Sequence, residues 1–197
     1  VVHNAIGSEF KFKNSKSDKF TFITVASLLH LKGLDLLVPA FKLARIPFDK
    51  WKMYIIGDGP EYGNLSKQIH ESGFQDNIFL LGKKNKVEIA ELLNNSNVFI
   101  LPSRMENFSV AILEALACGL PVIASLCGGV RECISDNNGI LFPVDDVNAL
   151  SNAIKNIYSK YDSYDRLKIA EDCNNQFSSE VIAQKLTDIF YSVLKNN

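Results

Sequence analysis

The hydrophobic and polar positions of the chain follow two alternating patterns. Short apolar runs rich in β-branched and aromatic residues predict strands at residues 20–27, 52–57, 77–82, 97–103, 121–125 and 139–143. Segments with apolar residues three or four positions apart predict helices over about 33–46, 61–73, 86–95, 108–118, 128–134, 146–160, 163–174 and 179–195. Strands and helices therefore alternate along most of the chain.

This alternation predicts one doubly wound α/β domain. Continuous apolar strands are typical of a parallel sheet that is covered by helices on both faces. We therefore expect a six-stranded, Rossmann-like parallel sheet within a domain at residues 20–197. Residues 1–19 are polar and irregular, and we expect them to be a linker and lead-in.

Composition and charge make several classes of protein improbable. The 197 residues are 47% hydrophobic and 22% charged, which is typical of a soluble globular domain. The net charge of −1 argues against nucleic acid or an anionic membrane as a partner attracted by bulk charge. No apolar run approaches the roughly 18 residues that a transmembrane helix needs. The four cysteines form no CxxC pair, so we expect reduced, mostly buried thiols.

The segments that follow the predicted strands contain the candidate ligand-binding positions. In an open parallel sheet, ligands bind beyond the carboxyl ends of the strands. Glycines recur at these ends, in the segments 26–33, 57–60, 82–85, 103–109 and 126–129. Each glycine either makes a tight turn or lets an anion approach amides at a helix N-terminus. The chain contains neither GxGxxG nor GxxxxGK[ST], so the usual dinucleotide and P-loop fingerprints are missing.

Two glutamates in the stretch RMENFSVAILEALACGLPVIAS point to a more specific chemistry. Glu106 precedes a predicted helix, where a carboxylate interacts well with the helix dipole. Glu114 lies within an apolar helix, where a carboxylate is costly unless it is exposed or paired. If the segment were fully helical, eight residues would span roughly 12 Å, about the reach from a sugar across a diphosphate to a ribose. Glu114 could then accept hydrogen bonds from vicinal hydroxyls, with the amides of Asn107, Phe108 and Ser109 facing the diphosphate or sugar.

The longer segment LPSRMENFSVAILEALACGLPVIASLCGGVRECI resembles the glutamate-x7-glutamate signature of family 4 retaining glycosyltransferases. These belong to the glycosyl transferases group 1 and have the GT-B fold. VASLLHLKGLDLLVPAF resembles the phosphate-binding strand–loop–helix of this family, YIIGDGPEYGNL its second-strand turn, and VVHNAIG its interdomain linker. The resemblance covers essentially the whole chain. It implies the C-terminal, nucleotide-sugar-binding domain of such an enzyme, without the N-terminal acceptor domain.

The resemblance also implies roles for individual residues. Glu106 would lie at the donor sugar beside the reacting centre as a catalytic residue, and Glu114 would hold the ribose hydroxyls. Lys32 would neutralise the diphosphate of the leaving group, and the base would lie along residues 81–83. The donor-binding residues implied in this way are Ser27, Lys32, Gly82, Lys83, Asn107, Phe108, Ser109, Val110 and Glu114.

The chain departs from the family pattern at two places. The arginine that usually accompanies the lysine is replaced by Ser27, which removes half of the cationic clamp. We hypothesise that His30, Lys83 or a group from the acceptor domain compensates, so that His30→Ala would weaken nucleotide diphosphate binding. The usual Gly-Phe-Gly after the first glutamate reads Asn-Phe-Ser at residues 107–109, which predicts a tighter or more polar sugar pocket.

The implied function is transfer of a sugar, with retention, from a nucleotide diphosphate sugar to a glycan or lipid-linked acceptor. Bacterial surface polysaccharide or lipopolysaccharide synthesis is the commonest context of such enzymes. We expect a cytoplasmic location, with peripheral contact at the inner membrane face as an option. The acceptor would bind through the missing domain, so this chain alone is expected to bind nucleotide without transferring sugar.

The implied transfer needs no metal and no cofactor. We interpret the adjacent carboxylates Asp145 and Asp146 as caps of the following helix. The last helix, ending in FYSVLKNN, is expected to pack against the missing domain. Two alternatives remain open at this point. One is another GT-B enzyme, such as a nucleotide-sugar epimerase, and the other is a non-catalytic scaffold on the same fold.

Overall fold

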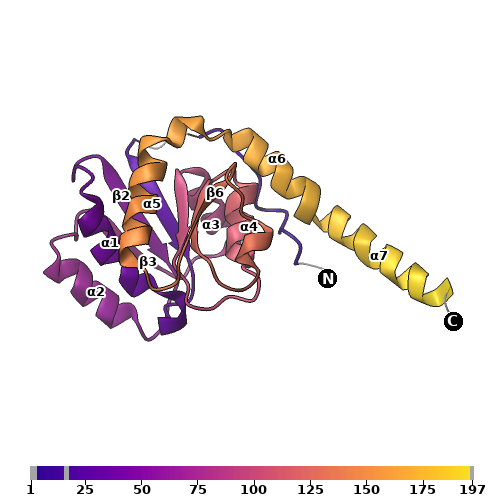
Figure 1. Ribbon diagram of the computed structural model, residues 1–197, viewed down its shortest axis with the longest axis horizontal. Helices are drawn as coiled ribbons and strands as arrows, with labels where there is room; N and C mark the ends of the chain where they lie inside the picture. Colours follow the sequence, from indigo (N-terminus) through magenta and orange to yellow (C-terminus); the bar gives the residue numbers. More distant parts are fainter. Residues whose placement is uncertain (1–3, 16–17, 196–197) are drawn as a thin grey trace.

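Within residues 4–15 and 18–195, which the computed structural model describes, six strands form one parallel sheet (Figure 1). The strand order is β3-β2-β1-β4-β5-β6. This order confirms the predicted doubly wound α/β fold. The strands are β1 (Phe20–Val25), β2 (Trp51–Ile56), β3 (Ile78–Gly82), β4 (Val98–Leu101), β5 (Val122–Ser125) and β6 (Gly139–Phe142).

Helices connect the strands and continue after the last of them (Figure 1). The α-helices are α1 (Leu37–Ala44), α2 (Tyr62–Glu71), α3 (Lys86–Asn94), α4 (Val110–Ala117), α5 (Val147–Ser159), α6 (Arg166–Phe177) and α7 (Ser179–Lys195). Short 3-10 turns are η1 (His30–Lys32), η2 (Leu34–Leu36), η3 (Gly128–Glu132) and η4 (Tyr161–Ser163).

Three of the predicted helices begin two or more residues later than the hydrophobic pattern indicates, and the one predicted over 163–174 begins at Arg166. The segment after β1 forms η1 and η2 before α1 starts at Leu37. Gly33 separates these two turns with a left-handed φ of 61°, and a Cβ there would lie 2.0 Å from the Pro102 carbonyl oxygen. The helix predicted over 108–118 begins at Val110, because Ser109 is still extended. Loop backbone therefore occupies positions that helical periodicity alone would assign to a helix.

Two hydrophobic clusters, one on each face of the sheet, form the core. One contains Phe22 and Trp51 together with side chains of α1, α2 and α5. The other contains Ile23 and Phe99 together with side chains of α3, α4 and α6. Because consecutive strand residues point to opposite faces, both faces of each central strand are buried. This explains why the strands are continuous apolar runs in the sequence.

Part of the lead-in segment packs onto the domain. Ile6 and Phe10 are buried in the second cluster. The Ile6 amide donates to the Phe177 carbonyl at 3.0 Å, and the Lys13 amide donates to Asn94 Oδ1 at 2.6 Å. Residues 1–3 and 16–17 of the predicted linker lie outside the described residues. The division into linker and domain remains a prediction.

Helix α7 extends away from the sheet and its covering helices (Figure 1). No helix among the described residues is long and apolar enough to cross a membrane. The outer part of α7 nevertheless carries large exposed apolar side chains: Leu186, Ile189, Phe190, Tyr191, Val193 and Leu194. The expectation that this face packs against an acceptor domain remains a prediction.

Candidate functional site

A cavity of about 300 Å³ lies at the carboxyl ends of β1 and β4. These strands are neighbours in the middle of the sheet, and the chain winds outward from them in both directions. This is the topological switch point at which open α/β sheets bind ligands. The cavity brings together six of the site residues predicted from the sequence: Ser27, Lys32, Glu106, Phe108, Ser109 and Val110.

Lys32 and Glu106 form an ion pair in this cavity. Lys32 Nζ lies 2.7 Å from Glu106 Oε1, and Ser103 Oγ donates a second hydrogen bond to the same oxygen at 2.8 Å. The Glu106 side chain is only 8% exposed and the Lys32 side chain 24%. A carboxylate at this depth needs a charged or hydrogen-bonding partner, which the pair supplies. The residues come from η1 and from the loop after β4, 74 positions apart in the chain.

The loop that carries Glu106 is held in place by the segment after β5. Gly128 has a left-handed φ of 51°, and a Cβ at this position would lie 1.6 Å from the Glu106 carbonyl oxygen. The Gly129 amide donates to the Asn107 carbonyl at 2.9 Å. Only glycine permits this close approach of two backbones. The Gly128-Gly129 pair therefore fixes the backbone of Glu106 and Asn107.

The N-terminus of α4 forms another side of the cavity. Ser109 precedes the helix in an extended conformation, and its side chain makes no capping hydrogen bond. Val110 and Ala111, the first helical residues, line the cavity. The first amides of an α-helix have no partner within the helix and favour anions. The cavity therefore combines a lysine ammonium with a helix N-terminus, which suits a phosphate group.

Glu114 lies on α4 but does not line this cavity. The side chain is half-buried, and among the described residues no hydrogen bond or ion pair reaches its carboxylate. Burial raises the pKa of Glu114 to about 7; Lys86 acts in the opposite direction, and Glu9 raises it further. Because α4 begins at Val110, the segment from Glu106 to Glu114 is not fully helical. The spacing estimated for a continuous helix therefore does not apply to this segment.

Gly82 and Lys83 lie at the end of β3, outside the cavity of Lys32 and Glu106. Gly82 has a φ of 67°, and a Cβ there would meet open space. Its carbonyl accepts a hydrogen bond from the Gly57 amide at 3.0 Å, which joins this strand end to that of β2. Lys83 is exposed, with Nζ 3.8 Å from Asp58 Oδ2. Asn107, also predicted for the site, is exposed in the loop next to Glu106.

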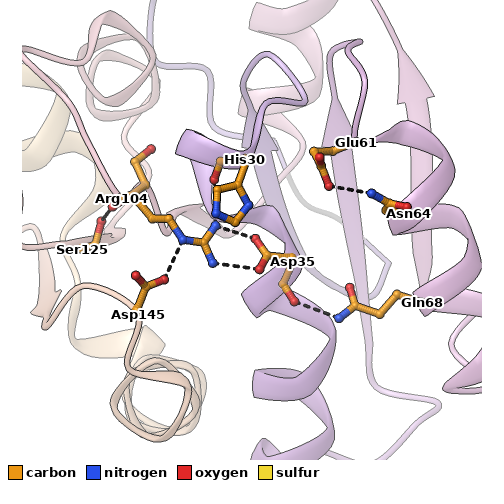
Figure 2. A network of polar contacts seen from close by, with 9 residues as sticks. His30, Asp35, Glu61, Asn64, Gln68, Arg104, Ser125 and Asp145 are labelled. Atoms are coloured by element: carbon orange, nitrogen blue, oxygen red, sulfur yellow. Dashed lines mark hydrogen bonds and ion pairs between the residues drawn. The ribbon is translucent and has the colours of Figure 1, made fainter.

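A second cavity, of about 360 Å³, is lined by His30. Asp35, Glu61 and Gln68 also line it, and Figure 2 shows these residues around one polar network. His30 does not line the cavity of Lys32 and Glu106. The geometry therefore gives no support to His30 as a replacement for the missing arginine.

Arg104 is the residue of this region that sequence reasoning missed. Its Nη1 and Nη2 donate to the two carboxylate oxygens of Asp35, each at 2.8 Å. Its Nε lies 2.7 Å from Asp145 Oδ1 (Figure 2). Asp146 accepts from the Ala149 amide at 2.8 Å and caps α5 as predicted. The interpretation of Asp145 as a second cap was wrong, because its carboxylate pairs with Arg104.

The cysteines and the other candidate metal ligands add no further centre. Cys118, Cys133 and Cys173 are free and buried, and burial raises the pKa of each thiol. Cys127 is free and half-buried. Reduced, mostly buried thiols were predicted. In the described part of the chain, no group of three or more histidine, cysteine, aspartate or glutamate side chains is placed to hold a metal ion.

Comparisons with known proteins give the family. The model of the glycosyl transferases group 1 matches residues 6–171. N-acetyl-alpha-D-glucosaminyl L-malate synthase of Bacillus anthracis is 30% identical over all of this chain and 54% of its own length. The putative colanic acid biosynthesis glycosyltransferase WcaL of Escherichia coli is 28% identical over 87% of this chain and 45% of its own. The chain thus spans about half the length of these curated relatives.

Solved structures share the fold. Sucrose-phosphate synthase from Thermosynechococcus elongatus superimposes with a TM-score of 0.83 and 25% identity, over 100% of this chain and 53% of that one. HepE from Anabaena, solved in complex with UDP, gives a TM-score of 0.79 and 24% identity, over 89% and 49%. With the family model matching most of its length, the chain belongs to the glycosyl transferases group 1 and has the Rossmann-like fold of GT-B enzymes.

Proposed function

We propose that this chain is the donor-binding domain of a retaining glycosyltransferase. The whole enzyme would move a sugar from a nucleotide diphosphate sugar to a glycan or lipid-linked acceptor. The single observation that carries this proposal is the ion pair of Lys32 with Glu106 beside the N-terminus of α4. A cation and a helix N-terminus together suit a diphosphate, and a carboxylate suits the hydroxyls of a sugar.

In this proposal each part of the donor is bound by different residues. The diphosphate would lie between Lys32 and the first amides of α4, where it replaces Glu106 as the partner of the ammonium. Glu106, freed in this way, would accept hydrogen bonds from the donor sugar. Glu114 would hold the ribose, and the open backbone at Gly82 and Lys83 would receive the base.

Catalysis would rest on stabilising the departing diphosphate. Negative charge grows on this group as the bond to the sugar breaks, and preorganised donors lower the energy of that state. Lys32 and the α4 amides are such donors. We propose front-face transfer with retention, in which the leaving diphosphate accepts the proton of the acceptor hydroxyl. The anomeric configuration of the product of the full-length protein, read by NMR, tests the stereochemistry.

The relatives support a nucleotide sugar as donor and a glycan pathway as context. HepE has been solved with UDP and with UDP-glucose, and WcaL is named for colanic acid biosynthesis. We propose a bacterial enzyme of surface polysaccharide or lipopolysaccharide synthesis that works in the cytoplasm, with contact at the inner membrane face. The acceptor would bind to a second domain that packs on the exposed face of α7.

Calorimetric titration of the chain with UDP, GDP and ADP tests the donor-site assignment. We expect one nucleotide to bind and the other two to bind more weakly, since Lys32 and the α4 amides serve any diphosphate whereas the base pocket discriminates. Uridine, guanosine and adenosine are the matched ligands without the diphosphate, and they should bind much more weakly. Absence of binding by all three diphosphates at millimolar concentration would contradict the proposal.

Glu106→Gln is expected to raise the affinity for the preferred nucleoside diphosphate by about three- to tenfold. The amide removes a negative charge that competes with the diphosphate for Lys32 and repels it. In the full-length protein the same variant should lose sugar transfer, because the carboxylate at the donor sugar is gone. Glu91→Gln, an exposed glutamate on α3, is the matched control. Equal or weaker affinity in Glu106→Gln would show that the ion pair does not compete with the ligand.

A further inference from the structure

Arg104 binds the segment that carries Lys32 at several points. Its backbone amide donates to the Leu31 carbonyl at 2.8 Å, and its Nη1 donates to the His30 carbonyl at 2.7 Å. Its guanidinium also forms the two-pronged pair with Asp35. These contacts fall just before and just after Lys32 in the sequence. Arg104 therefore holds the backbone before that lysine and the Asp35 side chain after it.

The same arginine links three loops at the carboxyl edge of the sheet (Figure 2). Arg104 itself follows β4, Asp35 follows β1, and Asp145 follows β6. Glu106 lies only two residues further along the loop of Arg104. Arg104 therefore connects the segment of Lys32 with the loop of Glu106, the two partners of the ion pair in the candidate site.

Arg104 is not itself a free cation for a phosphate. Its side chain is only 16% exposed, and both Asp35 and Asp145 pair with it. Its guanidinium lowers the pKa of Asp35 and so keeps that carboxylate charged. An arginine whose donors are already taken by two carboxylates and a carbonyl orients its surroundings and has little capacity for a ligand.

We propose that Arg104 is a positioning residue that aims the Lys32 ammonium at Glu106 and at the donor diphosphate. The positioning of Lys32 by Arg104 is independent of the proposed function. The effect of Arg104 on nucleotide affinity rests on the proposed function. Two substitutions test this role. Arg104→Met keeps an unbranched apolar side chain but removes every guanidinium contact. Arg104→Lys keeps the charge, yet the lysine cannot reach Asp35, Asp145 and His30 together.

Chemical labelling tests the position of Lys32 without any nucleotide. Reductive methylation by formaldehyde and dimethylamine-borane, read peptide by peptide by mass spectrometry, reports how accessible each lysine amine is to the reagent. We expect Lys32 to react at least about threefold faster in Arg104→Met than in the wild-type chain, since its ammonium, now held against Glu106 in a side chain that is 24% exposed, is released to solvent. Lys83, which is exposed in both, is the internal reference. Unchanged labelling of Lys32 would overturn the proposal.

A double-mutant cycle with the preferred nucleoside diphosphate tests whether Arg104 acts through Lys32. Arg104→Met is expected to weaken binding about tenfold in the wild-type chain and less than about twofold in the Lys32→Ala background. Arg104→Lys should regain only part of the affinity, and Arg45→Met, at the far end of α1, should change nothing. An equal loss in both backgrounds would overturn the proposed route through Lys32.

Thermal unfolding of each variant separates positioning from loss of fold. If Arg104→Met does not fold, Asp35→Asn takes its place, because it removes the charge that holds the guanidinium. Asp35→Asn is expected to speed the labelling of Lys32 in the same way. It should also weaken nucleotide binding more in the wild-type chain than in the Lys32→Ala background. If the wild-type chain binds none of UDP, GDP and ADP, the proposed function fails, and the labelling of Lys32 still decides the positioning role.

Discussion

Lys32→Ala is expected to weaken binding of the preferred nucleoside diphosphate by about 10- to 100-fold. Hydrogen bonds to charged groups contribute roughly 1.5–3 kcal/mol each, which corresponds to this range. The substitution also leaves the buried carboxylate of Glu106 without its ammonium partner, so that it repels the diphosphate. Calorimetric titration of the 197-residue chain measures the affinity directly.

Two variants control this experiment. Lys160→Ala removes an exposed lysine at the far end of α5 and should leave the affinity unchanged. Lys32→Ala combined with Glu106→Gln removes the ion pair as a unit and should bind more tightly than Lys32→Ala alone, because the unpaired carboxylate is gone. An affinity of Lys32→Ala within twofold of wild type would contradict a diphosphate site at this lysine.

Glu114→Gln is expected to stabilise the free chain while it weakens nucleotide binding. Burial raises the pKa of Glu114 from its ordinary value of 4.5 to about 7. Between these values the folded chain keeps a proton that the unfolded chain has lost, so the free energy of unfolding falls as the pH rises. Above about pH 7 the destabilisation is complete, because Glu114 is charged in both states.

The neutral amide removes this pH-dependent destabilisation. Since Glu114 is only half-buried, solvent screening reduces the expected gain at pH 8 to about 1–2 kcal/mol, and the gain should vanish below pH 4.5. Urea unfolding at pH 4 and pH 8 measures the difference, with the exposed Glu91→Gln on α3 as control. A gain of equal size at both pH values would contradict the assignment to the Glu114 charge.

The same variant should bind the preferred nucleoside diphosphate about tenfold more weakly, because an amide oxygen is a weaker acceptor for ribose hydroxyls than a carboxylate. Affinity in the wild-type chain should also rise between pH 6 and pH 8, as Glu114 loses its proton. Stability and binding would then change in opposite directions at one residue, which is typical of a functional group held in an unfavourable environment. Unchanged affinity would remove Glu114 from the site.

The fold was predictable because its signals are local. The strand β1, with Phe22 on one face and Ile23 on the other, is apolar at consecutive positions because both faces are covered. The alternation of such runs with amphipathic helices then requires parallel strands and crossover helices. Helix starts were less predictable, because backbone contacts between distant loops, such as Gly33 against Pro102, override helical periodicity.

The candidate site was only partly predictable. Lys32 and Glu106 were identified by resemblance, but their direct pairing depends on two loops that meet only in the folded chain. Arg104 gave no signal, since one arginine between Ser103 and Met105 is compatible with an ordinary exposed position. Asp145 adopts a left-handed φ of 59° at a turn, and only the fold brings its carboxylate to Arg104. Contacts of this kind are properties of tertiary structure.

A crystal structure of the chain with its preferred nucleoside diphosphate bound tests the central claim most directly. The account predicts phosphate oxygens within about 4 Å of Lys32 Nζ, a typical ion-pair distance, and next to the first amides of α4. The ribose should contact Glu114, and the base should lie beside Gly82 and Lys83. A nucleotide bound instead in the polar cavity of about 570 Å³ between the start of β6 and α6, or with its diphosphate away from Lys32, would contradict the account.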